Sequence, residues 1–188
     1  MPYPTQINRD QIIQQAAQMV AAEGAEALSL HKLAAALGVK APSLYRYVGG
    51  KADLLQAVNL LTLQELFAAM ETAQMAAPTE PIARMQALLA AYRDFALTRP
   101  RLYFLAFGDN DAYRPEEDVL LQMVLPIQAV MAEVAGQADS LAALRGALAL
   151  AHGFVMLELT NQLRRGGSLE EAFTLSAAAY LRGWQDKG

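Results

Sequence analysis

Two short helical segments joined by one glycine, within residues 29–48, constrain the fold of this chain more than any other feature. Ala34 is small enough for two helices to cross closely, and Gly38, four positions later, can take the positive φ of a tight turn. Leu44 follows six positions further on, where it can pack a second helix, expected over residues 42 to 47 or 48, onto the first. This spacing predicts a helix-turn-helix, which places the front of its second helix in the major groove of DNA.

The signals for the first helix of the chain are equally local. Asn8 is predicted to cap it, Gln11 stands three positions on as in a capping box, and Ile7 and Ile12 have the spacing of a hydrophobic staple. Gly24 fits the left-handed stop of a helix. We therefore expect the helix-turn-helix to consist of the second and third helices of a three-helix head.

Helices are predicted along the rest of the chain too. Alanine and leucine dominate, β-branched residues are sparse, and no segment alternates with a period of two. The fold class is therefore all-α, with a DNA-binding head at residues 1–50 and a larger helical domain at residues 51–188, about nine helices altogether. The helices expected after the head cover residues 51–73, 79–98, 100–107, 116–135, 140–164 and 169–186, the last with a capping box at Ser168 and Glu171.

The composition excludes several classes of protein. The chain is 54% hydrophobic and 18% charged over 188 residues, which is enough apolar material for a buried core. It has no cysteine, so disulfides, thiolate zinc sites and cysteine nucleophiles are ruled out. Residues 1–8 are polar rather than cationic and then apolar, and polar residues interrupt the apolar stretch at 147–163. We therefore expect a cytoplasmic protein with neither a secretory signal nor a membrane span.

The formal charge of −4 at pH 7 is distributed unevenly along the chain. Residues 1–51 carry five Lys or Arg against three Asp or Glu, whereas residues 52–188 carry ten against sixteen. A basic head on an acidic body is compatible with DNA binding, because phosphate contacts respond to local rather than to net charge.

Residues on the outer side of the helix-turn-helix suit contacts with DNA. Lys40 and Arg46 can reach phosphate or guanine, Ser43 can donate or accept a hydrogen bond, and Tyr45 and Tyr47 carry hydroxyls on stiff rings. Two tyrosines so close together can also belong to the core, so burial of either one is the alternative.

Residues 8–56 form a pattern that resembles the DNA-binding head of the TetR family. The pattern comprises the runs LSLHKLA at 28–34, LGV at 37–39, APSLYRYV at 41–48 and KADLL at 51–55. One position departs from it: Gly49-Gly50 stands where a better N-cap is common, so the start of the fourth helix is expected to be loosely held.

The resemblance implies roles for residues of the head. Ser29 and Lys51 would hold phosphates from helix N-termini, where backbone amides and the helix dipole favour anions. The residues that would face the groove are Lys40, Ser43, Tyr45 and Tyr47, with Arg46 and His31 as further candidates.

Two helices near the end of the chain are apolar on nearly every side. Leucine and aromatic side chains recur around the circumference of the segments at 140–164 and 169–186. A helix that is apolar all round is buried all round, and in a thin helical domain a second subunit can supply the covering surface. We therefore expect a two-fold symmetric homodimer through the last two helices, which would match a pseudo-palindromic operator in double-stranded DNA.

The stretch from Pro100 to Phe107, followed later by His152-Gly153, resembles the TetR-type C-terminal domain named for a Trp-His-Gly signature, although Ala151 stands at the tryptophan position. The resemblance implies a pocket for a small apolar or amphipathic ligand, and a repressor that such an inducer releases from its operator. Aromatic residues and methionines at helical spacing are more often plain core than ligand contacts. The candidate lining residues are Met70, Tyr92, Phe95, Tyr103, Phe107, Met123 and His152.

Catalysis, a metal and a cofactor have little support. The chain has two histidines, in separate parts, and lacks the HExxH, Walker and GxSxG patterns. The acidic loop that begins at Asp109 has Arg114 and Leu120 where an EF-hand needs glycine and glutamate. We therefore expect a regulator that is not an enzyme. The alternatives are a dimeric helical adaptor or small-molecule-binding protein that has lost DNA binding, and an enzyme on a helical scaffold.

Overall fold

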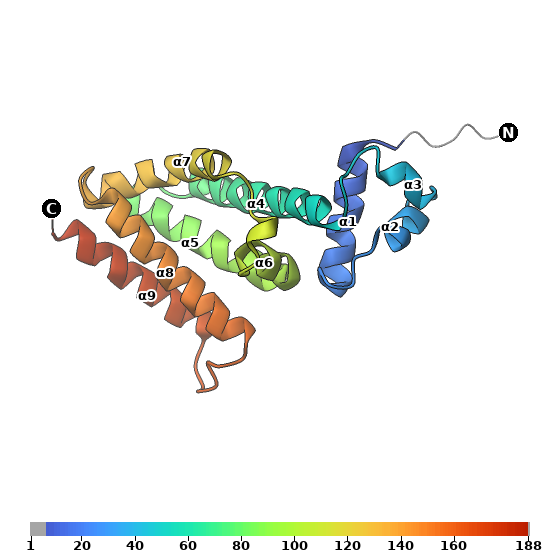
Figure 1. Cartoon of the computed structure of the whole chain (residues 1–188). Helices are drawn as coiled ribbons and strands as arrows, with labels where there is room; N and C mark the ends of the chain where they lie inside the picture. Colours follow the sequence, from blue (N-terminus) through green and yellow to red (C-terminus); the bar gives the residue numbers. More distant parts are fainter. Residues whose placement is uncertain (1–6, 188) are drawn as a thin grey trace. The chain divides into compact units, whose positions relative to one another are not determined.

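A computed structural model describes residues 7–187, which are helical with no strand among them (Figure 1). Residues 1–6 and residue 188 lie outside the described residues. The prediction about the polar stretch at residues 1–8 therefore falls largely outside them. The nine helices expected from the sequence are present over the described range. They are α1 (Arg9–Glu23), α2 (Leu30–Ala36), α3 (Ala41–Leu44), α4 (Lys51–Ala76), α5 (Pro81–Thr98), α6 (Pro100–Phe107), α7 (Glu117–Ala135), α8 (Ser140–Leu159) and α9 (Leu169–Gln185), with a short 3-10 helix, η1 (Asp111–Tyr113), between α6 and α7.

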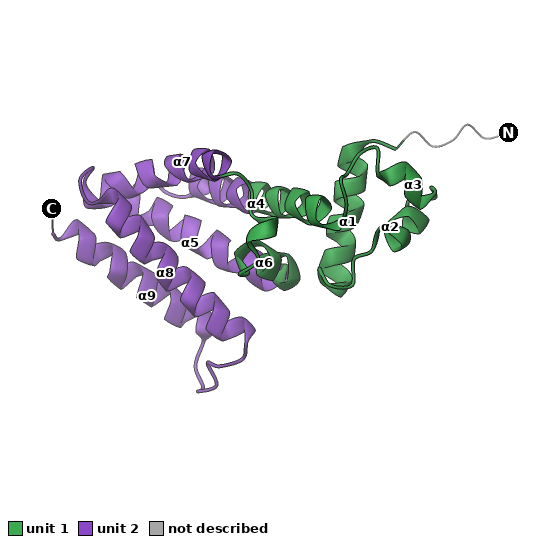
Figure 2. Cartoon of the chain, viewed as in Figure 1, with its two compact units in different colours: residues 1–65, 99–116 green, residues 66–98, 117–188 purple. Residues whose placement is uncertain are grey.

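The chain folds into two compact units (Figure 2). Unit 1 comprises residues 1–65 and 99–116, and unit 2 comprises residues 66–98 and 117–188. Unit 1 therefore contains α6 as well as the head, and α4 contributes residues to both units. The functional division at residue 50 that the sequence predicts stays a prediction, since these units are defined by packing alone.

The local signals for α1 describe its beginning well and its end only in part. The Asn8 side chain accepts from the Gln11 amide at 2.8 Å and the Gln11 side chain accepts from the Asn8 amide at 3.1 Å, so the capping box is confirmed. Ile7 and Ile12 are both buried in one cluster, as a staple requires. Gly24 ends the helix with φ 89° and ψ 162°, a positive φ but not the left-handed helical conformation expected.

The third helix is shorter than the sequence predicts. α3 ends at Leu44 and residues 45–47 form a turn, in which the amides of Tyr47 and Val48 both donate to the Leu44 carbonyl, at 2.9 and 3.1 Å. The prediction that it continues to Tyr47 or Val48 is therefore wrong. The chain leaves the helix in a tight turn before Gly49.

The eighth helix also ends early, at Leu159 rather than at residue 164. Asn161 takes a left-handed φ of 54°. The amide of Gln162 donates to the Leu157 carbonyl at 2.8 Å and that of Asn161 to the Glu158 carbonyl at 3.0 Å. This is the Schellman arrangement that satisfies the last carbonyls of a helix, with asparagine in the position that glycine usually occupies.

The core of unit 1 joins segments that are far apart in the sequence. Ile12 of α1, Leu44 of α3 and Leu54 of α4 are completely buried. Leu102 and Leu105 of α6 lie in the same cluster. α6 thus helps to form the core around which the head is built.

Unit 2 is a helical bundle in which α5, α7, α8 and α9 pack against one another. Two of its helices, α7 and α8, are long and apolar enough to cross a membrane, with 22% and 28% of the residues in their apolar windows buried. One or two such helices are weak grounds for a membrane protein, because helices that pack within a bundle or between subunits have the same composition.

Candidate nucleic-acid interface

The turn between α2 and α3 has the geometry that a helix-turn-helix requires. Ala34 is 2% exposed and Leu44 is fully buried, so both help to hold the two helices together. Gly38 adopts φ +68°, a backbone conformation in which a residue with a side chain would be strained. The Val39 amide closes the turn by donating to the Ala34 carbonyl at 2.9 Å. The structural roles predicted for Ala34, Gly38 and Leu44 are confirmed.

Five of the predicted DNA contacts lie on α3 or directly beside it. Tyr45 projects from unit 1 and is 61% exposed, whereas Tyr47 is half-buried against the hydrophobic core. Arg46 is exposed, with its guanidinium 5.9 Å from the centre of the Tyr47 ring. Lys40 is exposed and Ser43 is half-buried. The two tyrosines therefore differ: Tyr45 is accessible, and Tyr47 supports the turn that carries Arg46.

The two residues expected to hold phosphates stand at helix N-termini. Ser29 caps α2, its Oγ accepting from the Lys32 amide at 3.2 Å, and its own hydroxyl hydrogen remains to be donated. Lys51 is the first residue of α4 and donates from Nζ to the Glu26 carbonyl at 2.9 Å. An ammonium has three N–H groups, so this bond is compatible with a phosphate contact. His31 is exposed on α2.

The start of α4 is better held than its glycines predict. The Asp53 carboxylate accepts from the Gly49 amide at 2.7 Å, and Arg9 lies 4.0 Å from the other Asp53 oxygen. Gly50 takes φ 145°, which a residue with a side chain rarely adopts. The expectation of a loosely held start overlooked Asp53, whose position three residues into the helix is the signal that could have shown it.

The seven candidate ligand residues are divided between the two units. Tyr103 and Phe107 of α6 belong to unit 1, with their ring centres 4.7 Å apart. The others, which belong to unit 2, are Met70, Tyr92, Phe95, Met123 and His152. Within unit 2 the structure brings Tyr92 and His152 together, the tyrosine oxygen lying 3.5 Å from the imidazole Nδ1. Met123 is half-buried, while Met70 and Phe95 are buried.

His152 lies on the apolar helix α8, and burial lowers the pKa of its imidazole below the ordinary value. Because desolvation disfavours the charged form, the imidazole stays neutral at a pH where a solvated histidine would begin to bind a proton. A neutral ring keeps one donor and one acceptor nitrogen, which suits a site within an apolar bundle.

The lowered pKa of His152 predicts that the stability of the protein depends on pH. Unfolding restores the ordinary pKa, so the unfolded chain binds the proton first as the pH falls. The free energy of unfolding is therefore expected to decrease between about pH 7 and about pH 5, with no contribution from this group at higher pH. Denaturant unfolding of the wild type and of a His152→Gln variant measures the effect, and the variant should lose less stability over the interval. An equal loss in both would contradict the prediction.

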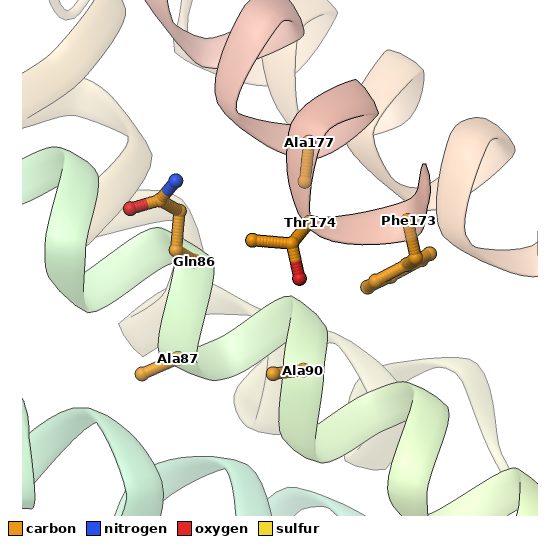
Figure 3. Close-up of a pocket in the computed structure, with 6 residues that line it drawn as sticks. All are labelled: Gln86, Ala87, Ala90, Phe173, Thr174 and Ala177. Atoms are coloured by element: carbon orange, nitrogen blue, oxygen red, sulfur yellow. The ribbon is translucent and has the colours of Figure 1, made fainter. Parts of the chain in front are cut away.

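One pocket of unit 2 lies between α5 and α9 (Figure 3). It has a volume of about 250 Å³ and is lined by Gln86, Ala87, Ala90, Phe173, Thr174 and Ala177. None of the seven predicted lining residues is among these six, and none of the six is charged. Over residues 7–187, no group of three or more His, Asp or Glu side chains is placed to hold a metal ion.

A buried ion pair in unit 2 was missed by sequence reasoning. Arg93 of α5 donates from Nε and Nη2 to the two carboxylate oxygens of Glu158 on α8, at 2.8 and 2.6 Å. The two side chains are only 10% and 14% exposed. The guanidinium also lies 5.6 Å from the centre of the Phe173 ring on α9, so the pair joins three helices. The signal in the sequence was an arginine among the apolar positions of α5.

A head with this α2–α3 turn, and with Lys40, Tyr45 and Arg46 exposed at the two ends of α3, defines a helix-turn-helix DNA-binding protein. Family models match both parts of the chain: the tetR family of bacterial regulatory proteins over residues 12–58, and the tetracyclin repressor-like C-terminal domain over residues 85–180. The chain belongs to the TetR family, and it is a transcriptional regulator rather than an enzyme.

Curated relatives agree with this assignment. An uncharacterized HTH-type transcriptional regulator of Bacillus subtilis is 27% identical over 94% of this chain and 92% of its own length. Another, of Mycobacterium tuberculosis, is 29% identical over 84% of this chain and 73% of its own length. An HTH-type transcriptional repressor of Streptomyces coeruleorubidus is 48% identical over 54 residues, which are 29% of this chain and 20% of that protein.

Solved structures share the fold along the whole chain. A protein of unknown function from Rhodococcus sp. RHA1 aligns with a TM-score of 0.84 at 25% identity, over 98% of this chain and 99% of its own. A TetR variant from Acinetobacter baumannii in complex with minocycline aligns with a TM-score of 0.68 at 20% identity, over 97% and 98% of the two chains. The predicted family and fold class are confirmed.

Proposed function

We propose that this regulator docks on duplex DNA through α3, with Tyr45 and Ser43 reading bases and Ser29 and Lys51 holding phosphates. The observation that carries the proposal is the exposure of Tyr45, which is 61% exposed beside a helix-turn-helix whose other large apolar side chains pack in or against the core of unit 1. The side chains proposed to contact phosphate or bases around it are His31, Lys40, Arg46 and Tyr47.

Two copies are proposed to bind together. Leu141 and Leu148 of α8 are 43% and 47% exposed, and Leu175 of α9 is 70% exposed. α8 packs against α9, so these side chains belong to neighbouring helices of unit 2. A second copy that covers them would form a two-fold dimer, and such a dimer fits a pseudo-palindromic operator.

We further propose that the protein is a cytoplasmic repressor that a small apolar or amphipathic molecule releases from DNA. Two similar proteins support this mode of action. One is the HTH-type transcriptional repressor of Streptomyces coeruleorubidus, and the other is the TetR variant from Acinetobacter baumannii in complex with minocycline. Unit 2 would hold the molecule, either at the candidate residues around His152 or in the uncharged pocket between α5 and α9. Release requires that the molecule bind the released conformation more tightly than the DNA-bound one.

The docking model is tested by the DNA affinity of two variants, on a duplex that the wild-type protein selects from a random-sequence library. Lys51→Ala should weaken binding about tenfold on every sequence and reduce the slope of log affinity against log salt by about one, because a phosphate contact is lost. Tyr45→Ala should change the preferred bases, with discrimination altered by about 1–3 kcal/mol at the positions it reads.

Lys187→Ala is the matched control for charge, since Lys187 is an exposed lysine in unit 2 that pairs with Asp139. It should leave both the affinity and the salt dependence unchanged. Wild-type affinity and unaltered base preference in the Lys51 and Tyr45 variants would refute the docking model. Absence of wild-type binding to any duplex would favour a helical adaptor that has lost DNA binding.

A further inference from the structure

The C-terminal end of α1 is left without the usual cap of a helix. The last four carbonyls of any α-helix have no partner within the helix. The Gly24 amide donates to the Val20 carbonyl at 2.8 Å, but Gly24 has φ 89° and ψ 162°, so the chain does not enter the left-handed conformation that turns further amides back onto the carbonyls that follow. The last turn of α1 carries no basic residue either. The carbonyls of Ala21, Ala22 and Glu23 are left to water or to donors from other parts of the chain, since these three residues are exposed.

Arg101, at the start of α6, supplies such donors. Its Nη1 lies 3.2 Å from the Ala21 carbonyl oxygen and also donates to the Ala22 carbonyl. A guanidinium at this place both satisfies the carbonyls and lies at the negative end of the helix dipole. Arg101 thus caps a helix that precedes it by about eighty positions in the sequence.

Two more cations reach the same segment, residues 21–26, which we call the α1 junction. Lys32 of α2 donates to the Glu23 carboxylate at 3.0 Å. Lys51 of α4 donates to the Glu26 carbonyl at 2.9 Å. With Arg101 of α6, side chains from three different helices converge on six consecutive residues. The α1 junction is therefore the place where polar contacts attach α2 and α6 to the end of α1, and α4 to the loop that follows it.

The packing around Arg101 reinforces this attachment. Leu102 and Leu105, on the same helix, are 6% and 9% exposed within the core cluster of unit 1. Val20, in the last turn of α1, is fully buried in that cluster. A helix whose end is held by both apolar and charged contacts has little freedom to shift, and α2 packs directly on α1.

We infer that Arg101 is a positioning residue for DNA binding: by capping α1 it fixes the orientation of the helix-turn-helix, without itself contacting DNA. The inference needs only that the protein binds DNA, and it is independent of which residues of α3 read the bases. If Arg101 positions the helix-turn-helix, α6 contributes to DNA binding, although α6 lies outside the segment that the sequence identifies as a DNA-binding domain.

The test compares variants of the full-length protein on the library-selected duplex, at a temperature where circular dichroism shows each of them to be folded. Arg101→Met retains most of the side-chain stem and removes the donors. It should weaken binding about 5- to 20-fold, because the end of α1 is no longer held to α6 by hydrogen bonds, and α1 and the attached α2 can move. The loss should be the same on all duplexes, and the dependence of affinity on salt should be unchanged.

Two variants separate the cap from charge and packing. Arg101→Lys keeps a cation that can reach the same carbonyls and should restore affinity to within about threefold of the wild type. Arg99→Met removes the same charge two residues away, where Arg99 pairs with Glu65, and should leave affinity unchanged.

Several outcomes would overturn the inference. Wild-type affinity in Arg101→Met would show that the cap does not position the head. A salt slope reduced by about one would make Arg101 a phosphate contact instead. Equal losses in the Arg99 and Arg101 variants would point to net charge alone. If Arg101→Met does not fold, Arg101→Ala, which also removes every donor, takes its place in the test, with the same expected loss and the same contradicting results.

Discussion

Replacing Glu158 with glutamine is expected to lower the free energy of unfolding by about 3–5 kcal/mol, because it leaves the guanidinium of Arg93 buried without a counter-charge. Both side chains of the pair are at most 14% exposed, so water cannot replace the lost carboxylate. Denaturant unfolding measures the change. Trp184, the single tryptophan of the chain, lies on α9, so its fluorescence reports on the unfolding of unit 2. Glu170→Gln, at an exposed position of α9, is the matched control and should stay within about 0.5 kcal/mol of the wild type.

A double variant decides whether the ion pair itself stabilises unit 2. Arg93→Met combined with Glu158→Leu removes both charges and keeps similar volume, and it should recover most of the stability lost by Glu158→Gln. Recovery would show that the cost lies in the unpaired charge. A loss below about 1 kcal/mol in the single variant would contradict the prediction, since it would mean that solvent reaches Arg93.

Replacing Leu175 with glutamate is expected to dissociate the proposed dimer and to lower DNA affinity at least 100-fold. Leu175 is 70% exposed in the single chain, an exposure that a second copy would remove. A carboxylate there would be buried unpaired on both subunits, and each subunit would lose the about 1.5–3 kcal/mol that burial of a leucine contributes. Sedimentation measures the oligomeric state, and fluorescence anisotropy with the selected duplex measures affinity.

The matched control for this variant is Leu121→Glu on α7. Leu121 is 49% exposed, so the same change is made on an exposed leucine outside the last two helices. The control should remain dimeric and bind DNA as the wild type does. A dimeric Leu175→Glu protein would exclude the proposed interface, and dissociation of the Leu121 variant would move the interface to α7.

Much of the head, and the start of α9, was predictable because the signals act over a few residues. The caps at Asn8, Ser29 and Ser168 each bind an amide three positions further on, so the pattern is visible in the sequence itself. Gly38 was identified for the same reason, since a positive φ within a short turn is a local demand. The all-α class and the succession of helices follow from such signals and from helical periodicity.

The sites for ligand and partner were less predictable, because aromatic and leucine side chains look alike whether they face a core, a ligand or a second subunit. Tyr45 and Tyr47, two positions apart, have the same residue type, yet one is exposed and the other rests on the core. Of the residues around the pocket between α5 and α9, none was among the candidates. The pocket exists where small alanine side chains line it, and an alanine in a helix does not by itself indicate a pocket in the sequence.

By itself, the sequence determined the helix-turn-helix, its caps and the TetR-like character of the head, since all of these rest on residues close together along the chain. Only the tertiary structure decided that α6 belongs to the core of the head, that Arg101 caps α1, and that Arg93 and Glu158 meet inside unit 2. Those contacts join residues between about sixty and eighty positions apart. Periodicity cannot specify such pairs, because the packing of whole helices brings them together.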